Sequence, residues 1–125
     1  MARSFGAVVI GTPDPAGTAA FYRELLGWLT VEGDDPDFIR LRDPGRERPG
    51  LSFQRESGFI APTWPPQPGA QQLQAHLDVL VDDLDAEVAR ALALGACRDD
   101  HQPAEGVVIM RDPWGGVFCL FLDGY

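Results

Sequence analysis

The sequence lacks long apolar runs and contains few basic residues. No stretch approaches the roughly 20 apolar residues that span a bilayer, and the N-terminus, Met-Ala-Arg-Ser-Phe-Gly, lacks the apolar core of a signal peptide. Ten Lys and Arg against nineteen Asp and Glu give a formal net charge of -9, which would repel nucleic acid and anionic membranes. We therefore expect a cytoplasmic protein with no nucleic-acid partner and no membrane partner.

Cysteine is also scarce. The two cysteines, Cys97 and Cys119, lie in segments that otherwise look buried, and a disulfide is not expected in a reducing compartment. The segment at 11–18 lacks the lysine and the glycine spacing of a phosphate-binding loop. What remains is ordinary globular composition, with 45% hydrophobic and 23% charged residues in a chain of 125, enough for one domain with a real core.

The most informative stretch is the alternating run at 73–81, Leu-Gln-Ala-His-Leu-Asp-Val-Leu-Val. Its period of two predicts a strand whose apolar residues, Leu73 among them, share one face. The opposite face carries His76 and Asp78 beside Leu80. An imidazole and a carboxylate two residues apart indicate the lining of a polar cavity rather than plain surface.

The chain repeats the order strand, helix, three strands. In the first half we expect strands at 5–10, 28–31, 38–41 and 51–54, with a helix capped by Asp14 and ended by Gly27. In the second half we expect strands at 73–81, 97–100, 107–111 and 117–122, with a helix capped by Asp82 or Asp83 and ended by Gly95. Superposing the halves puts Asp14 on Asp83, Ala7 on His76, and Gln54 near Cys119.

This order predicts an α+β fold in which two βαβββ modules pair into a half-open, barrel-like mixed sheet. The single domain, 1–125, would consist of module one at 1–57, a proline-rich linker at 58–72 and module two at 73–125. The linker carries apolar anchors, including Trp64. This indole either plugs the end of the core or closes over a pocket.

Three features of these modules point to a known family: Phe21-Tyr22 and Leu26-Gly27 in the first helix, Asp112-Pro-Trp-Gly-Gly before the last strand, and His76 at the start of module two. With these features, the modules resemble the vicinal oxygen chelate superfamily. Its members include glyoxalase I, bleomycin resistance proteins, fosfomycin resistance proteins and extradiol dioxygenases. Within it, the chain is similar to the small bacterial glyoxalase-like proteins. The resemblance covers nearly the whole chain.

In metal-using members, each module supplies one ligand from its first strand and one from its last. The resemblance places these positions at Ala7 (or Val8), Gln54, His76 and Cys119. His76 is a usual ligand, Gln54 could supply an amide oxygen, and a thiolate at Cys119 would favour zinc. The resemblance thus implies a depleted site with His76 and Gln54 as candidate ligands for Zn, Ni, Mn or Mg, and we expect no cofactor.

Other polar residues have simpler interpretations. Asp78 could orient the His76 imidazole or stabilise its charged form, or it could simply lie exposed at a cavity rim. The triplet Asp99-Asp100-His101 is interpreted as a solvated turn rather than a metal site. Cys119, between two apolar neighbours, is interpreted as inert core.

Two functions compete. The first is binding of a small, partly aromatic or apolar molecule, as bleomycin resistance proteins do by sequestration, in a pocket lined by His76, Gln54, Asp78, Trp64, Phe53, Trp28, Trp114 and Cys119. The acidic surface suits a cationic or neutral ligand. The second is metal-dependent catalysis, as a lactoylglutathione-lyase-like lyase or isomerase or as a dioxygenase. A purely interactive role stays open, and open sheet edges predict a homodimer.

Overall fold

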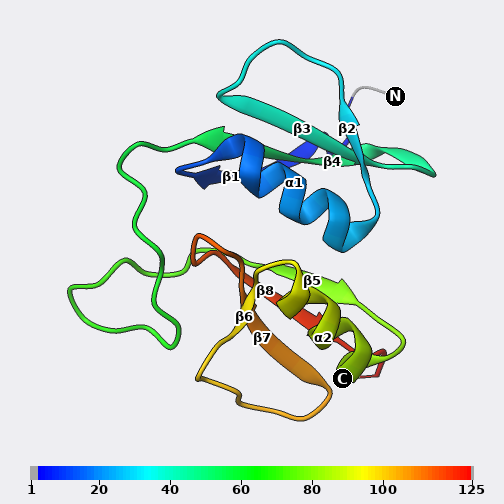
Figure 1. Cartoon of the computed structure of the whole chain (residues 1–125). Helices are drawn as coiled ribbons and strands as arrows, with labels where there is room; N and C mark the ends of the chain where they lie inside the picture. Colours follow the sequence, from blue (N-terminus) through cyan, green and yellow to red (C-terminus); the bar gives the residue numbers. More distant parts are fainter. Residues whose placement is uncertain (1–2, 125) are drawn as a thin grey trace. The chain divides into compact units, whose positions relative to one another are not determined.

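The computed structural model describes residues 3–124. The first half of the chain forms β1 (Ala7–Thr12), α1 (Pro15–Leu26), β2 (Leu29–Val31), β3 (Phe38–Asp43) and β4 (Arg46–Arg55). The second half forms β5 (Leu77–Leu80), α2 (Leu84–Ala93), β6 (Cys97–Arg98), β7 (Val107–Arg111) and β8 (Val117–Phe121) (Figure 1). The chain divides into two compact units, up to Phe59 and from Ile60 onward, so most of the proline-rich linker belongs to the second unit.

Both units have the same strand order. The first sheet runs β1-β4-β3-β2 and the second β5-β8-β7-β6, and neither closes into a barrel. In each sheet the first strand pairs in parallel with the last, and the other pairs are antiparallel. The predicted α+β class and the duplicated βαβββ module are therefore confirmed.

The helix ends follow local side-chain chemistry. The Asp14 carboxylate accepts a hydrogen bond from Gly17 N at 3.1 Å, and Gly27 ends α1 with a φ of 69°, a conformation that glycine adopts without strain. The Asp83 carboxylate accepts from Ala86 N at 3.1 Å, so Asp83 rather than Asp82 caps α2. Within residues 3–124, neither helix is long and apolar enough to cross a membrane.

The strand predicted at 73–81 is shorter than its alternating pattern. β5 begins at Leu77, which lies opposite Phe118 of β8, its one neighbour in the sheet. His76 therefore directly precedes the strand. Leu73, predicted on the face opposite His76, instead packs against the cluster that contains Cys119. The predicted alternation of side chains between two faces therefore does not extend to the residues before β5.

Phe53 belongs to the core of the first unit. Its side chain is 0% exposed, and its ring stacks on Tyr22 of α1 with centroids 5.2 Å apart. Leu41 and Leu51 of the same sheet are also buried. The prediction that Phe53 offers a flat surface to a ligand is thus not supported, because a ring with no exposed area cannot present one.

The second sheet is buried on both faces of β7 and β8. α2 packs against these strands and supplies buried Val88 and Ala91. The other face, which we call the Cys119 face, consists of four buried residues: Val107, Ile109, Val117 and Cys119. The linker residue Trp64 packs on it together with Leu73 and Phe121. The linker therefore contributes to the core of this unit.

The two cysteines differ in their environment. Cys119 is buried, as predicted, but Cys97 is exposed in the two-residue edge strand β6. The prediction of burial was wrong for Cys97 because its apolar neighbour Ala96 is buried while the edge strand turns the next side chain outward.

Arg111 ties the linker to the sheet. Its Nε donates to Asp99 Oδ2 at 2.6 Å, and its Nη1 donates to the carbonyl oxygens of Pro62 and Gly115. The side chains of Arg111 and Asp99 are only 16% and 11% exposed. The prediction of a solvated turn was therefore wrong for Asp99, which forms a partly buried ion pair with a residue 12 positions away.

The charge of Asp99 is stabilised in the fold. Burial alone would raise the pKa of this carboxyl, but hydrogen bonds from Arg111 and from His101 N, with the positive charge of Arg111, lower the pKa below its ordinary value of 3.8. A carboxyl whose pKa is lower in the folded state than in the unfolded state stabilises the protein at pH values above its unfolded-state pKa. This contribution is lost as the pH falls through the folded-state pKa.

We predict that Asp99→Ala lowers the free energy of unfolding by about 3–5 kcal/mol at pH 7, because it leaves the Arg111 guanidinium without its partner. Asp37→Ala, which breaks the exposed Arg55–Asp37 pair, is the matched control and should cost less than about 1 kcal/mol. Urea denaturation measures both. The difference between wild type and Asp99→Ala should shrink below about pH 4, and a difference independent of pH would contradict the ionic origin.

Candidate functional site

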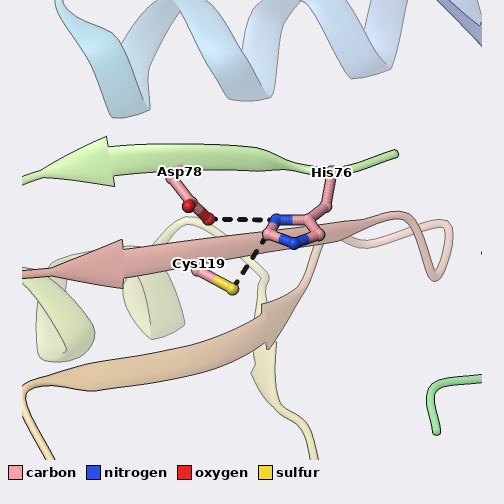
Figure 2. A group of neighbouring side chains, drawn as sticks. All are labelled: His76, Asp78 and Cys119. Carbon is pink, nitrogen blue, oxygen red and sulfur yellow. Dashed lines mark hydrogen bonds and ion pairs between the residues drawn. The ribbon is translucent and has the colours of Figure 1, made fainter. Parts of the chain in front are cut away.

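Three polar side chains meet on the Cys119 face of the second sheet. The parallel register places Asp78 of β5 opposite Cys119 of β8, and the ring of His76, just before β5, lies within reach of both side chains. Figure 2 shows the imidazole turned toward both partners. His76 Nδ1 is 3.0 Å from Asp78 Oδ1 and 3.9 Å from Cys119 Sγ.

The Asp78 carboxylate contacts the His76 ring, a geometry that suits the predicted role of orienting the imidazole. A hydrogen bond donated by Nδ1 to Asp78 Oδ1 selects the tautomer that leaves Nε2 as an acceptor. The His76 side chain is 26% exposed and that of Asp78 is 50% exposed. The pair therefore combines a fixed ring with access for a small polar group.

The Cys119 thiol is held in its neutral form. Burial, with the nearby Asp78 charge and a hydrogen bond to Asp78, raises the pKa of the thiol to about 12. Because the thiolate is the nucleophilic and metal-binding form, Cys119 is unreactive at neutral pH. This environment agrees with the interpretation of Cys119 as inert core.

Trp64 covers the imidazole. Its ring stacks on His76 with centroids 4.8 Å apart and planes 29° apart. The chain on its N-terminal side is held, because Pro62 O accepts from Arg111 and Thr63 N donates to Gln71 O at 2.8 Å. Trp64 thus lies in an anchored segment of the loop.

His101 is a neighbour that the sequence interpretation missed. Its imidazole lies edge-on to Trp64, with centroids 6.2 Å apart and planes 66° apart. The position of His101 follows from the bond between its backbone N–H and Asp99 Oδ1 at 2.8 Å. No local pattern reveals this contact, since it depends on the pairing of Asp99 with Arg111.

Trp114 lies in the turn that leads into β8. Asp112 Oδ1 accepts from the backbone N–H groups of Trp114 and Gly116, both at 2.9 Å. Gly115 adopts a φ of 90°, and a Cβ there would lie 2.7 Å from Ala61 Cβ. The turn therefore packs against the linker that carries Trp64.

The remaining predicted pocket residues belong to the first unit. Gln54 is exposed, and its Nε2 donates to Glu56 Oε1 at 3.3 Å. Trp28 follows the end of α1, where its backbone N–H donates to Arg23 O at 3.1 Å. The structure thus brings together His76, Asp78, Cys119 and Trp64, while Gln54, Trp28 and the buried Phe53 form part of a different unit.

The register also corrects the proposed counterpart of Cys119. Ala7 lies opposite Gly50 and Val9 opposite Ser52, just as Asp78 lies opposite Cys119. If Ala7 corresponds to His76, then Val9 corresponds to Asp78, and Ser52 rather than Gln54 corresponds to Cys119. The two-residue error arose because β3 and β4 contain a register shift between Leu41 and Asp43, which sequence alignment of the halves could not locate.

The residues present do not fit a metal centre that takes ligands from both modules. His76, Asp78 and Cys119 place ligand atoms within 4.8 Å of one another. All three of these donors belong to the second module. The corresponding positions of the first module carry Ala7, which has no donor, and Ser52, a weak one.

Comparisons with known proteins agree with this architecture. A family model described as a glyoxalase-like domain matches residues 7–121. No match was found among curated proteins.

Solved structures share the fold at low sequence identity. A glyoxalase/bleomycin resistance protein/dioxygenase family enzyme from Burkholderia phytofirmans is 21% identical, with a TM-score of 0.70 over 96% of this chain and 98% of that one. Lactoylglutathione lyase from Agrobacterium tumefaciens is 20% identical (TM-score 0.64, coverage 98% and 97%). A fosfomycin resistance protein from Listeria monocytogenes is 14% identical (TM-score 0.70, coverage 98% and 94%).

The family match spans nearly all of the two βαβββ modules, and the structural relatives have the same fold. The chain therefore belongs to the glyoxalase-like domain family of the vicinal oxygen chelate superfamily.

Proposed function

We propose that this protein binds a small, partly aromatic or apolar molecule at the Cys119 face, beside the His76–Asp78 pair. The observation that carries the proposal is the Trp64 indole stacked on an imidazole whose tautomer Asp78 selects. A flat apolar surface next to a few oriented polar atoms is typical of ligand sites.

Each side chain has a defined part in this proposal. The Trp64 ring offers its aromatic surface to the ligand, His76 Nε2 accepts a hydrogen bond, and the half-exposed Asp78 carboxylate favours a neutral or cationic ligand over an anion. Binding of this kind suits sequestration, which needs no reactive group.

A second candidate is a metal-dependent lyase, isomerase or dioxygenase of the same superfamily. It is favoured by the three converging donors His76, Asp78 and Cys119. Against it stands the lack of strong donors at the corresponding positions of the first module, Ala7 and Ser52. We therefore rank it second.

The ligand can be sought by a thermal-shift screen of metabolites and then titrated into variants. We predict that Trp64→Ala weakens binding by about 5- to 30-fold, because the loss of an aromatic stack and its buried area is worth about 1–2 kcal/mol. Trp64→Phe should keep part of the affinity, and Trp28→Phe, in the first unit, is the control. If Trp64→Ala changes neither affinity nor the fluorescence response to ligand, the indole only fills the core.

Metal content separates the two candidates. We predict that elemental analysis of the purified protein finds much less than one divalent metal ion per chain, because only one usual ligand, His76, lies at the superfamily positions. We also expect no lactoylglutathione formation from methylglyoxal and glutathione. The contrary result would be about one zinc, nickel or manganese ion per chain that is lost in His76→Ala but retained in His101→Ala. It would make metal-dependent catalysis the first candidate function.

We further infer a homodimer. The edge strands β1 and β5 carry exposed apolar side chains, with Val8 38% and Leu80 56% exposed, and an edge of this kind pairs readily with another chain. Light scattering at tens of micromolar should give the mass of two chains. A monomer at that concentration would contradict the inference, and Leu80→Glu tests whether the edge of β5 is the contact.

A further inference from the structure

We propose that His101 is a positioning residue, whose imidazole holds the Trp64 indole over His76. The inference rests on the proposed function and assigns a part to a side chain that the proposed function does not use. The sequence contains two histidines, and both contact this one indole. His76 is stacked on the indole, and His101 lies edge-on to it. Two separate stretches of the second unit thus bring their imidazoles to the same ring.

The turn that carries His101 is fixed on both sides of this residue. On one side, Asp99 Oδ1 accepts from His101 N at 2.8 Å, and Arg111 Nε donates to the other oxygen of that carboxylate at 2.6 Å. On the other side, the Gln102 amide donates to Asp99 O at 2.7 Å and to Ile109 O at 2.8 Å, and it accepts from Ile109 N at 3.0 Å. Ile109 is 1% exposed, so the turn is bonded to the buried part of the sheet.

The Gln102 amide takes the place of a strand at this edge of the sheet. The ladder between β6 and β7 covers only Cys97 and Arg98 of β6. Beyond it, the backbone N–H and C=O of Ile109 are bonded by the Gln102 side chain, as they would be by a neighbouring strand. The His101 turn therefore has the support of a paired strand although it is irregular, and the imidazole is carried on a rigid base.

The Trp64 side chain needs support of this kind. The bonds at Pro62 and Thr63 hold the main chain before the indole, but they leave its side-chain torsions free. The residues that follow, 65–69, are exposed. The contact with His101 is edge-on and lies within the range of about 4.5–7 Å that favours aromatic pairs. His101 therefore limits rotation of the indole away from His76.

A ring that is already in place favours binding, because the free energy of ordering it is not lost when the ligand arrives. The His101 ring makes no hydrogen bond within residues 3–124, where its one hydrogen bond is donated by the backbone. Its contact with Trp64 is thus the interaction that the fixed turn provides. His101 acts through Trp64 in this proposal and does not contact the ligand.

Proton NMR of the untagged protein tests this role without a ligand. A proton above an aromatic ring resonates upfield, so the Hε1 signal of His76 reports whether the Trp64 indole covers the imidazole. In His101→Ala one histidine is left, so the remaining Hε1 signal belongs to His76. Trp64→Ala gives the position of this signal for an uncovered ring. Spectra at about pH 8.5 keep the imidazole neutral.

We expect His101→Ala to move the His76 signal toward its position in Trp64→Ala, and more so on warming. Loss of an edge-on aromatic contact lowers the ratio of covered to open forms by about 2- to 10-fold. His101→Phe keeps a ring at this place and should leave the signal near its wild-type position. Gln102→Ala loosens the turn and should act in the same direction as His101→Ala. Asp100→Ala, an exposed neighbour in the same turn, is the matched control and should have no effect.

Two results would overturn the positioning role. One is a His76 signal that stays at its wild-type position in His101→Ala even on warming, and the other is an equal displacement in His101→Phe. Urea denaturation of the same variants shows that they are folded under the conditions of the spectra. If His101→Ala does not fold, Gln102→Ala carries the test with the same expected displacement. Because no ligand is used, failure here is distinct from failure of the proposed function, which the metabolite titrations decide.

Discussion

The partly buried ion pair between Arg111 and Asp99 is the contact on which the second unit depends. Through one guanidinium it joins the β6–β7 connection, the linker at Pro62 and the turn at Gly115. Those attachments place Trp64 over His76 and bring His101 to its edge. A charged pair with little exposure is costly unless fully bonded, and here the carboxylate also accepts from His101 N. Stability and site geometry therefore rest on the same residues.

The duplicated module keeps its architecture while its chemistry has diverged. Both sheets have the same strand order and the same parallel pairing of first and last strands. Yet the positions occupied by His76 and Cys119 in the second sheet correspond to Ala7 and Ser52 in the first. Hydrogen bonding between strands involves the backbone, so the fold tolerates such exchanges. The family fold is thus retained although the two modules carry different side chains at these positions.

Net charge and local charge lead to different expectations for ligands. The value of -9 excludes polyanions, because their affinity depends on summed charge over a large surface. A small ligand responds to the few angstroms around it, and at the Cys119 face the nearest exposed charge is the half-exposed Asp78 carboxylate. The ligand proposed for that face is therefore neutral or cationic.

The sequence by itself determined the features that depend on neighbouring residues. The strand-helix-strand order, the Asp14 cap, the Gly27 end of α1 and the alternation of His76 with Asp78 follow from local propensity and period. Tertiary structure decided what depends on distant partners. The pairing of β5 with β8 begins only at Leu77, and the burial of Asp99 came from Arg111. The counterpart of Cys119 came from the parallel registers of β1 with β4 and of β5 with β8, which a local pattern cannot reveal because register is set by pairing across the sheet.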